Sequence, residues 1–253
     1  MTDQPPARGA PDHTVTLTTA ERQRVAVNQR PKDAATMLIL DRSGSTPRVL
    51  MGKRHPGHKF MPGKYVFPGG RLDPGDRMMA ATGTLAQICE DRLSARMQRP
   101  SPGKARALAL AAIRETFEET GMLFGSAEFG APENPPAGSW ADFAAQNVFP
   151  DLSAVTFVAR AITPPRRPKR FDTRFFAIDA GHVAARIEGV TGPDSELVDL
   201  VWVDFDEAQA LDLPTITKVI LQEVAARIEK GFAPWLPVPF YWEKRGSFVR
   251  EEL

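Results

Sequence analysis

The feature that most constrains the fold is the acidic stretch at residues 114–121, Arg-Glu-Thr-Phe-Glu-Glu-Thr-Gly, which ends an apolar run that begins near Ala105. At about 100° per residue, a helix through this region places three apolar residues in one narrow sector: Leu110, Ile113 and Phe117. Three glutamates fall on the opposite side: Glu115, Glu118 and Glu119. The stretch therefore predicts an amphipathic helix that packs through one side and carries three carboxylates on the other.

These carboxylates lie on neighbouring turns and repel one another. Glu115 meets Glu118 and Glu119 at spacings of three and four, and each like-charged pair costs roughly 0.2–0.5 kcal/mol. A hard divalent cation removes the conflict, because clustered oxygen ligands suit Mg²⁺ or Mn²⁺. The structural alternative is a solvated acidic face that ends at a glycine cap, Gly121. Taken alone, the helix favours this alternative.

A second motif lies upstream at residues 67–76, Phe-Pro-Gly-Gly-Arg-Leu-Asp-Pro-Gly-Asp. With this motif the chain resembles the Nudix hydrolases, whose signature is a Gly, five residues, an acid, seven residues, and then Arg-Glu-apolar-any-Glu-Glu-any-Gly-apolar. The matching residues are Gly70, Asp76, Arg114, Glu115, Glu118, Glu119, Gly121 and Met122. Because both half-motifs are specific and occur in the right order, a metal site is favoured over a solvated acidic face.

The match departs from the family in three places. Asp76 stands where the family usually has Glu, Thr116 fills a position that is usually apolar, and 38 positions rather than 8 separate Asp76 from Arg114. A box split in this way is similar to the coenzyme A diphosphatase-like branch, which also carries an insertion there. Residues 77–104 are therefore predicted to be a helical insertion within the Nudix box. The insertion either caps the site, contributes to a homodimer, or is a surface elaboration.

The resemblance implies an α/β fold, a Nudix-type α/β/α sandwich with a mixed sheet. It also implies metal ligands for Mg²⁺ or Mn²⁺ at Glu115, Glu118 and Glu119, with Arg114 as a residue that orients them. Cations held there would neutralise diphosphate oxygens and lower the pKa of a bound water. A further acid from a late loop often completes such a site. The candidates for this acid, in order of preference, are Glu196, Asp194 and Glu188.

Residues that would bind the substrate come from three segments. Gly69 and Gly70 permit a close backbone approach. A basic loop precedes them, and its Leu50, Arg54, Gly63 and residues 67–70 match the upstream pattern of coenzyme A-cleaving Nudix proteins. Four positions depart from that pattern: Met51, Gly52, His55 and Lys59, of which Lys59 keeps the charge of the expected Arg. The segment 165–176 contributes Arg170 and Arg174 and a Phe-Asp-Thr motif that this branch also has. Solvated basic loops are the alternative for both segments.

The first function hypothesis is therefore a metal-dependent diphosphatase that cleaves coenzyme A or acyl-coenzyme A to 3′,5′-ADP and 4′-phosphopantetheine. The alternative within enzymes is another nucleotide substrate, namely ADP-ribose, NADH or a dinucleoside polyphosphate. A catalytically silent Nudix module that senses a ligand comes from a different class. That reading predicts lost glutamates or an appended DNA-binding domain, and all three glutamates are present.

Composition narrows the class of protein further. A net charge of +1 gives no support to binding of nucleic acid or a membrane surface. Cys89 is the single cysteine, so no disulfide forms within the chain and a reducing compartment fits. No apolar run approaches the ~20 residues that span a bilayer. We expect a soluble cytoplasmic protein with a small-molecule nucleotide substrate.

Periodicity and turn residues divide the chain into a flexible tail at 1–33 and a single domain at 34–253. Within the tail, Thr14 to Thr18 is predicted to form a short edge strand. Further strands are predicted at 35–40, 48–54, 65–67, 122–124, 156–163, 172–179 and 197–204. Helices are predicted at 78–97, 105–121, 140–148, 205–211 and 215–230. The aromatic segment 235–242 is predicted to pack over an apolar surface rather than to stack on a base.

Overall fold

The computed structural model describes residues 13–20, 26–58, 61–97 and 100–253. In these ranges nine strands form one mixed sheet, in the order β11-β10-β6-β7-β1-β2-β3, with β4 also paired to β1 and β9 to β2. The strands are β1 (Lys32–Asp41), β2 (Arg48–Arg54), β3 (Tyr65–Val66), β4 (Gly69–Arg71), β6 (Thr156–Ile162), β7 (Phe171–Asp179), β9 (Leu197–Asp204), β10 (Pro239–Lys244) and β11 (Ser247–Glu252). Two pairs run parallel, β1 with β7 and β10 with β6.

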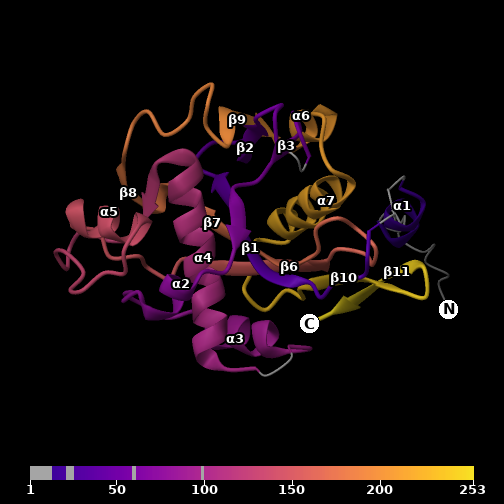
Figure 1. Ribbon diagram of the computed structural model, residues 1–253, viewed down its shortest axis with the longest axis horizontal. Helices are drawn as coiled ribbons and strands as arrows, with labels where there is room; N and C mark the ends of the chain where they lie inside the picture. Colours follow the sequence, from indigo (N-terminus) through magenta and orange to yellow (C-terminus); the bar gives the residue numbers. More distant parts are fainter. Residues whose placement is uncertain (1–12, 21–25, 59–60, 98–99) are drawn as a thin grey trace, which may run out of the picture.

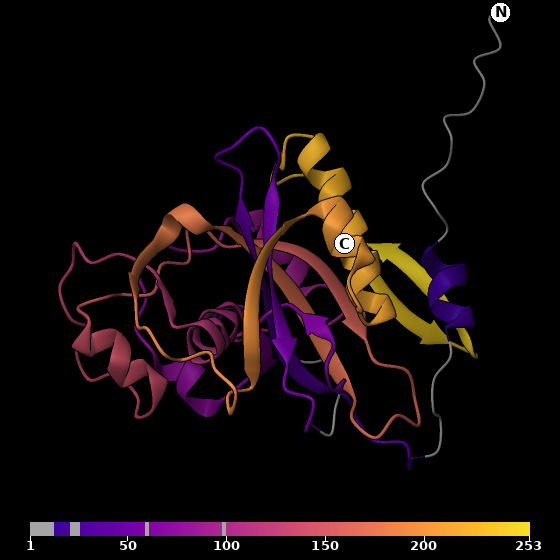
Figure 2. The same ribbon diagram turned by 90° about the horizontal axis from the view of Figure 1, so that it is seen from above.

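Helices cover both faces of this sheet, as Figures 1 and 2 show. The helices on one face are α2 (Pro74–Met78), α3 (Gln87–Ser94), α4 (Pro102–Thr120) and α5 (Ser139–Ala145). Those on the other face are α1 (His13–Thr19), α6 (Phe205–Ala210) and α7 (Thr215–Glu229). A separate two-stranded sheet joins β5 (Met122–Phe124) to β8 (Val183–Arg186), which follows a short 3₁₀ turn at Ala180–His182. The predicted α/β/α sandwich with a mixed sheet is confirmed.

The central strand β1 separates two hydrophobic cores. Its residues alternate between them, with Met37 and Ile39 in the core under α4 and Leu38 and Leu40 in the core under α7. A strand covered on both faces reads as a continuous apolar run, which is the pattern at 34–40. The strand therefore supports α4 from below and also carries β4 along its edge.

The helix α4 has well-defined ends. The Ser101 side chain accepts a hydrogen bond from the Lys104 amide, and Pro102 follows at the first position, where its missing N–H costs nothing. At the other end Gly121 adopts φ 74°, and its amide donates to the Phe117 carbonyl at 2.8 Å. A side chain at this position would also meet the Ile187 carbonyl oxygen at 2.1 Å. The helix therefore ends at Thr120, one residue after Glu119.

The insertion differs from its prediction. Its helical parts are the end of α2, the whole of α3 and the start of α4, and the predicted continuous helix from Met78 to Met97 is wrong for 79–86 and for 95–97. Backbone pairing explains the break, because the Thr82 amide donates to the Pro150 carbonyl and the Thr82 carbonyl accepts from Leu152. The apolar residues of the insertion, Leu85, Cys89, Leu93 and Met97, still enter the core beneath α4. The insertion is therefore packed into the domain.

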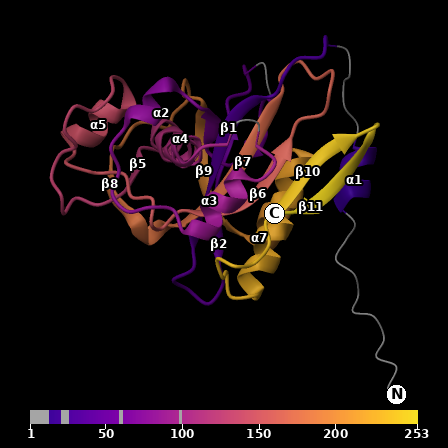
Figure 3. The same cartoon turned by 90° about the horizontal axis from the view of Figure 1, so that it is seen from below.

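Two regions near the termini also differ from prediction. The predicted edge strand at Thr14 to Thr18 is wrong, because α1 occupies these residues and buries Leu17. Strand β1 begins at Lys32, inside the segment predicted as a tail. At the other end the aromatic segment enters the sheet as β10, which buries Phe240 and Tyr241 and pairs with β11 (Figure 3). Neither β8, β10 nor β11 was expected.

No helix in the described ranges combines the length and apolar character that crossing a bilayer requires.

Candidate active site

The last two turns of α4 face the glycine turn that begins β4. The Glu119 carboxylate accepts a hydrogen bond from the Gly69 amide at 3.0 Å, and only 5% of Glu119 is exposed. The Glu115 carboxylate lies directly against Gly70, because a Cβ built on that glycine would meet the Glu115 Oε2 atom at 2.2 Å. The two predicted motifs, which residues 77–113 separate in the chain, are thus brought into contact.

Gly70→Ala is a test of this close approach. The added methyl group would displace the Glu115 carboxylate while leaving the helix and the strand in place. We expect a loss of activity of about a hundredfold, on the scale seen when groups supporting a metal site are displaced. Steady-state kinetics and thermal melting would measure it. Gly44→Ala is the matched control, because a Cβ there meets nothing within 4 Å. Equal activity in the two variants would contradict the assignment.

Arg114 fixes the other carboxylates from the centre of the cluster. Its Nη1 donates to Oε1 of Glu115 and of Glu118, both at 3.0 Å. Its Nε and Nη2 donate to the two oxygens of Asp76, at 2.7 and 3.1 Å, and Nη2 also donates to the Arg71 carbonyl. Burial alone would lower the pKa of this guanidinium, but the hydrogen bonds to Asp76 and the charge of Glu115 raise it overall. Arg114 therefore stays charged and orients two glutamates.

Asp76 holds Arg114 in place from beneath the cluster. The side chain is fully buried. It accepts hydrogen bonds from the Trp140 indole at 3.2 Å and from the Asp73 amide at 2.8 Å, in addition to those from Arg114. The Asp73 bond is half of a capping box that starts α2. Asp76 is therefore a positioning residue, which acts on the glutamates through Arg114.

Glu196 also lies at this cluster, although it comes from a distant loop before β9. Its carboxylate forms an ion pair with Arg54 of β2 at 2.9 Å, and its carbonyl accepts from the His55 amide. Of the other acids considered for this role, Asp194 is exposed, and Glu188 is 82% exposed in its side chain and pairs with Arg186. Glu196 is exposed as well, but its charge acts on both Glu115 and Glu119, and its role as the further acid stays a prediction.

The electrostatics of the cluster are unfavourable for ionised carboxylates. Burial raises the pKa of Glu115 to about 7, and Glu118 and Glu196 add to this while Arg114 opposes it. Burial also raises the pKa of Glu119 well above its usual range, and the charges of Glu196 and Glu115 act in the same direction. The repulsion predicted from the helical spacing is therefore present, and Arg114 and Arg54 only partly compensate for it.

The chain is similar to known proteins in sequence and in structure. No model of a known protein family matches the chain. A crystal structure of a Nudix hydrolase from Alicyclobacillus acidocaldarius is 28% identical and superposes with a TM-score of 0.58, covering 78% of this chain and 92% of that one. The chain has the Nudix hydrolase fold. It is also 29% identical over 192 residues to the putative nudix hydrolase 7 of Caenorhabditis elegans, over 71% of this chain and 55% of that protein.

The chain therefore spans about half the length of this curated relative. Similarity in sequence and in fold supports its place in the Nudix hydrolase superfamily. The split-box branch stays a prediction, because neither similarity distinguishes it. The separation of 38 positions between Asp76 and Arg114 that suggested it is spanned by an ion pair between these two residues.

The donor set of this candidate site suits a hard divalent cation. Burial and the charges of neighbouring carboxylates, including Glu196, raise the pKa values of Glu115 and Glu119, and a bound cation would oppose both effects. In the ranges that the structure describes, no three His, Cys, Asp or Glu side chains are arranged to hold a metal ion. Hydrogen bonds give the reason, since Glu115 and Glu118 are turned to Arg114 and Glu119 to the Gly69 amide. The metal assignment stays a prediction.

Two residues predicted to bind the substrate, Arg170 and Arg174, have partners away from the helix glutamates. A third, Lys59, lies outside the described residues. Arg170 donates to the Thr163 and Gln29 carbonyls and to the Asn28 side chain, so it closes the N-terminal segment onto the sheet. Arg174 is buried and pairs with Asp33 and Asp172 near the start of α4. Lys59 falls in one of the gaps. In the described residues, the hydrogen-bond and ion-pair partners of Arg170 and Arg174 do not include the helix glutamates, and their role in substrate binding stays a prediction.

Two residues at the site escaped the sequence analysis. The Ser139 hydroxyl donates to Oε1 of Glu118 at 2.5 Å, and Trp140 holds Asp76 as described above. Both begin α5, whose helical pattern was recognised at Trp140 without a reason to connect it to the glutamates. A serine before a buried tryptophan carries no signal of its own in a single sequence.

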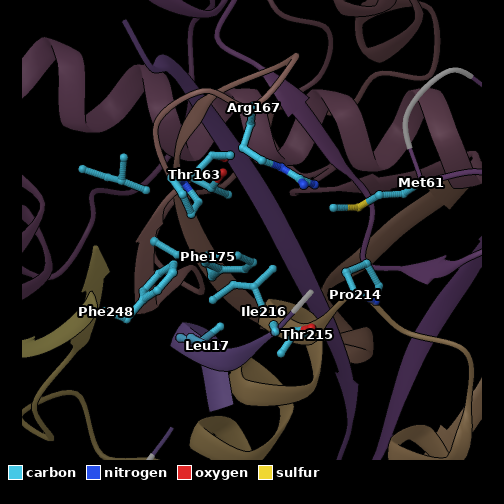
Figure 4. A pocket seen from close by; sticks show the side chains of 14 residues that line it. Leu17, Met61, Thr163, Arg167, Phe175, Pro214, Thr215, Ile216 and Phe248 are labelled. Carbon is cyan, nitrogen blue, oxygen red and sulfur yellow. The ribbon is translucent and has the colours of Figure 1, made fainter. Parts of the chain in front are cut away.

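An apolar pocket of about 160 Å³ lies on the other face of the sheet, between β7, α1 and α7. Figure 4 shows Leu17, Phe175, Ile216 and Phe248 on its floor and walls, with Arg167 and Met61 facing each other at its rim. None of the glutamates of the site lines it. The pocket therefore belongs to the hydrophobic core under α7 and is separate from the carboxylate cluster.

Proposed function

We propose that the chain is a divalent-metal-dependent diphosphatase. The observation that carries the proposal is the convergence of Glu115 and Glu119 on the glycine turn, with Arg114 holding Glu115 and Glu118 from behind. A structural acidic helix would place these side chains in solvent, whereas Glu119 is almost fully buried. Burying carboxylates that repel one another costs stability, and this cost is explained by a cationic ligand.

Each residue of the candidate site would have its own role in diphosphate hydrolysis. Glu115, Glu118 and Glu119 would hold Mg²⁺ or Mn²⁺, which when bound neutralises diphosphate oxygens and makes a water molecule more acidic. Arg114 keeps two of these carboxylates in one orientation. Glu196 would accept a proton from the attacking water, with Arg54 holding it in place. The absence of side chains at Gly69 and Gly70 would leave room for the phosphates against the backbone.

The first candidate substrate is coenzyme A or acyl-coenzyme A. The support is the pattern shared with coenzyme A-cleaving Nudix proteins, and two of its members lie at the site: Arg54 contacts Glu196, and Gly70 contacts Glu115. The alternatives are ADP-ribose, NADH and dinucleoside polyphosphates. Each has a diphosphate linkage, so the carboxylate cluster suits them equally.

Incubation of the purified chain with Mg²⁺ or Mn²⁺ and each of these compounds, followed by mass analysis of the products, tests the proposal. We expect coenzyme A to give 3′,5′-ADP and 4′-phosphopantetheine, and chelation of the metal to stop the reaction. Cleavage of ADP-ribose with coenzyme A left intact would replace the substrate and keep the mechanism. Binding of a nucleotide without any cleavage would instead identify a ligand-binding module.

A further inference from the structure

A second charged cavity lies on the α4 face of the sheet, at the opposite end of the helix from the glutamates. It has a volume of about 640 Å³. Five basic residues line it: Arg30, Arg96, Lys104, Arg160 and Arg174. The acidic residues in its lining are Asp33 and Asp172. If Glu251 is also counted, because it pairs with Arg96 from outside the lining, the basic residues are still in excess by two.

Two of these arginines form a buried pair of like charges. Arg160 of β6 and Arg174 of β7 are direct cross-strand partners, and they are 3% and 1% exposed. Like charges directly opposite on neighbouring strands destabilise a sheet. The proximity of Arg160 adds to burial in lowering the pKa of Arg174, although Asp172 and Asp33 oppose this. The fold thus tolerates a repulsion that its own residues do not remove.

The carboxylates present are shared among several cations. Asp172 forms two hydrogen bonds with Arg160 and also lies 3.2 Å from Arg174 Nη1. Asp33 pairs with both Lys104 and Arg174, each at 2.7 Å. In the described ranges the hydrogen bonds of Arg174 all start from Nη1, and its buried Nε has no partner. A buried donor without a partner costs about 1–3 kcal/mol.

A purely structural role accounts for one of these residues. Arg160 donates to the Ala95 carbonyl at the end of α3 and lies over the Phe240 ring at 4.4 Å, so it ties the insertion to β10. Arg96 pairs with Glu251 of β11 and Lys104 with Asp33 of β1, and each of these cations reaches the cavity from a different element. Side chains of like charge that converge on one cavity from a helix, a loop and the sheet favour an anionic ligand over a solvated surface.

We propose that this cavity binds a small soluble anion of the phosphate class. Its position makes it separate from the carboxylate cluster, because Lys104 and Glu115 stand three turns apart, about 16 Å along α4. The sign of the charge also differs, so the two cavities select opposite ligands. The proposal does not depend on the diphosphatase reaction, and binding can be measured with the metal removed.

Titration calorimetry with inorganic phosphate and with pyrophosphate, in the presence of a chelator, tests the proposal. Both anions are expected to bind the unmodified chain, pyrophosphate more tightly. The double variant Lys104→Gln, Arg96→Gln removes two cations at the cavity rim, and we expect about a tenfold or greater loss of affinity from the lost charge-assisted hydrogen bonds. Lys104→Arg keeps the charge and should restore most of the affinity.

Arg48→Gln is the matched control. Arg48, like Arg96, is a largely exposed arginine with one carboxylate partner, Asp41, but it lies outside the cavity. Its affinity for phosphate should equal that of the unmodified chain. Thermal melting would establish that all variants are folded. Absence of phosphate binding, or equal affinity in the double variant and the control, would overturn the proposal.

Discussion

Replacement of Glu118 by glutamine is expected to lower kcat about a thousandfold, since the loss of one carboxylate that holds a catalytic cation removes about 4 kcal/mol of transition-state stabilisation. The fold should survive, because the Glu118 side chain is 35% exposed and its partners are Arg114 and the Ser139 hydroxyl. Glutamine can still accept a hydrogen bond from either donor. The measurement is steady-state turnover of the best substrate at saturating Mg²⁺, together with the melting temperature.

Glu128→Gln provides the control for this experiment. Glu128 is an exposed glutamate in the loop after β5, and its replacement removes the same charge from a place without catalytic neighbours. Its turnover should match that of the unmodified chain. Full activity in Glu118→Gln would show that this residue holds no essential metal.

The second large effect concerns the stability of the buried ion pair. Arg114→Met removes the partner of Asp76, a fully buried carboxylate, and leaves that charge without a cation. Removal of one member of a buried pair typically destabilises a protein by about 3–5 kcal/mol. For a chain of this size that corresponds to a fall in melting temperature of about 10 °C. Activity should fall as well, because Glu115 and Glu118 lose the group that orients them.

The double variant Arg114→Met, Asp76→Asn separates the two causes. It removes the stranded charge. The single side-chain oxygen of asparagine can keep one of the two hydrogen bonds from Trp140 and the Asp73 amide, which go to different oxygens of Asp76. We expect its melting temperature to recover part of the loss, while activity stays low. A double variant that melts below Arg114→Met would show that Asp76 has a stabilising role apart from the pair.

The sequence was sufficient for elements with a strong local pattern. Strands with continuous apolar runs, such as 35–40, and helices with clear caps, such as α4, were predicted to within three residues. It was insufficient where tertiary contacts override that pattern. The Thr/Val alternation at 14–18 resembles a strand, but Leu17 packs against the second core as part of a helix. The apolar spacing from Leu85 to Met97 is helical, but backbone pairing of Thr82 with the 150–152 segment interrupts the helix before it.

The candidate site shows the same division. The contact between the two half-motifs followed from the resemblance to Nudix hydrolases, whereas the choice of Glu196 as a further acid stays a prediction. The distance of Arg170 and Arg174 from the glutamates was not predictable, because a basic segment in a sequence does not reveal which end of a strand its side chains occupy. Trp140 and Ser139 were not connected to the glutamates, because they reach them only through the position of α5.

The ion pair between Asp76 and Arg114 also bears on how the chain tolerates its insertion. The pair closes a loop whose entropic cost grows only with the logarithm of its length, so an increase in separation from 8 to 38 positions costs about 1.4 kcal/mol. Burial of Leu85, Leu93 and Met97 beneath α4 offsets this amount with ease, at roughly 1.5–3 kcal/mol per side chain. The spacer can therefore vary in length while the pair that closes it stays fixed, which leaves the geometry of the glutamates independent of what lies between the two half-motifs.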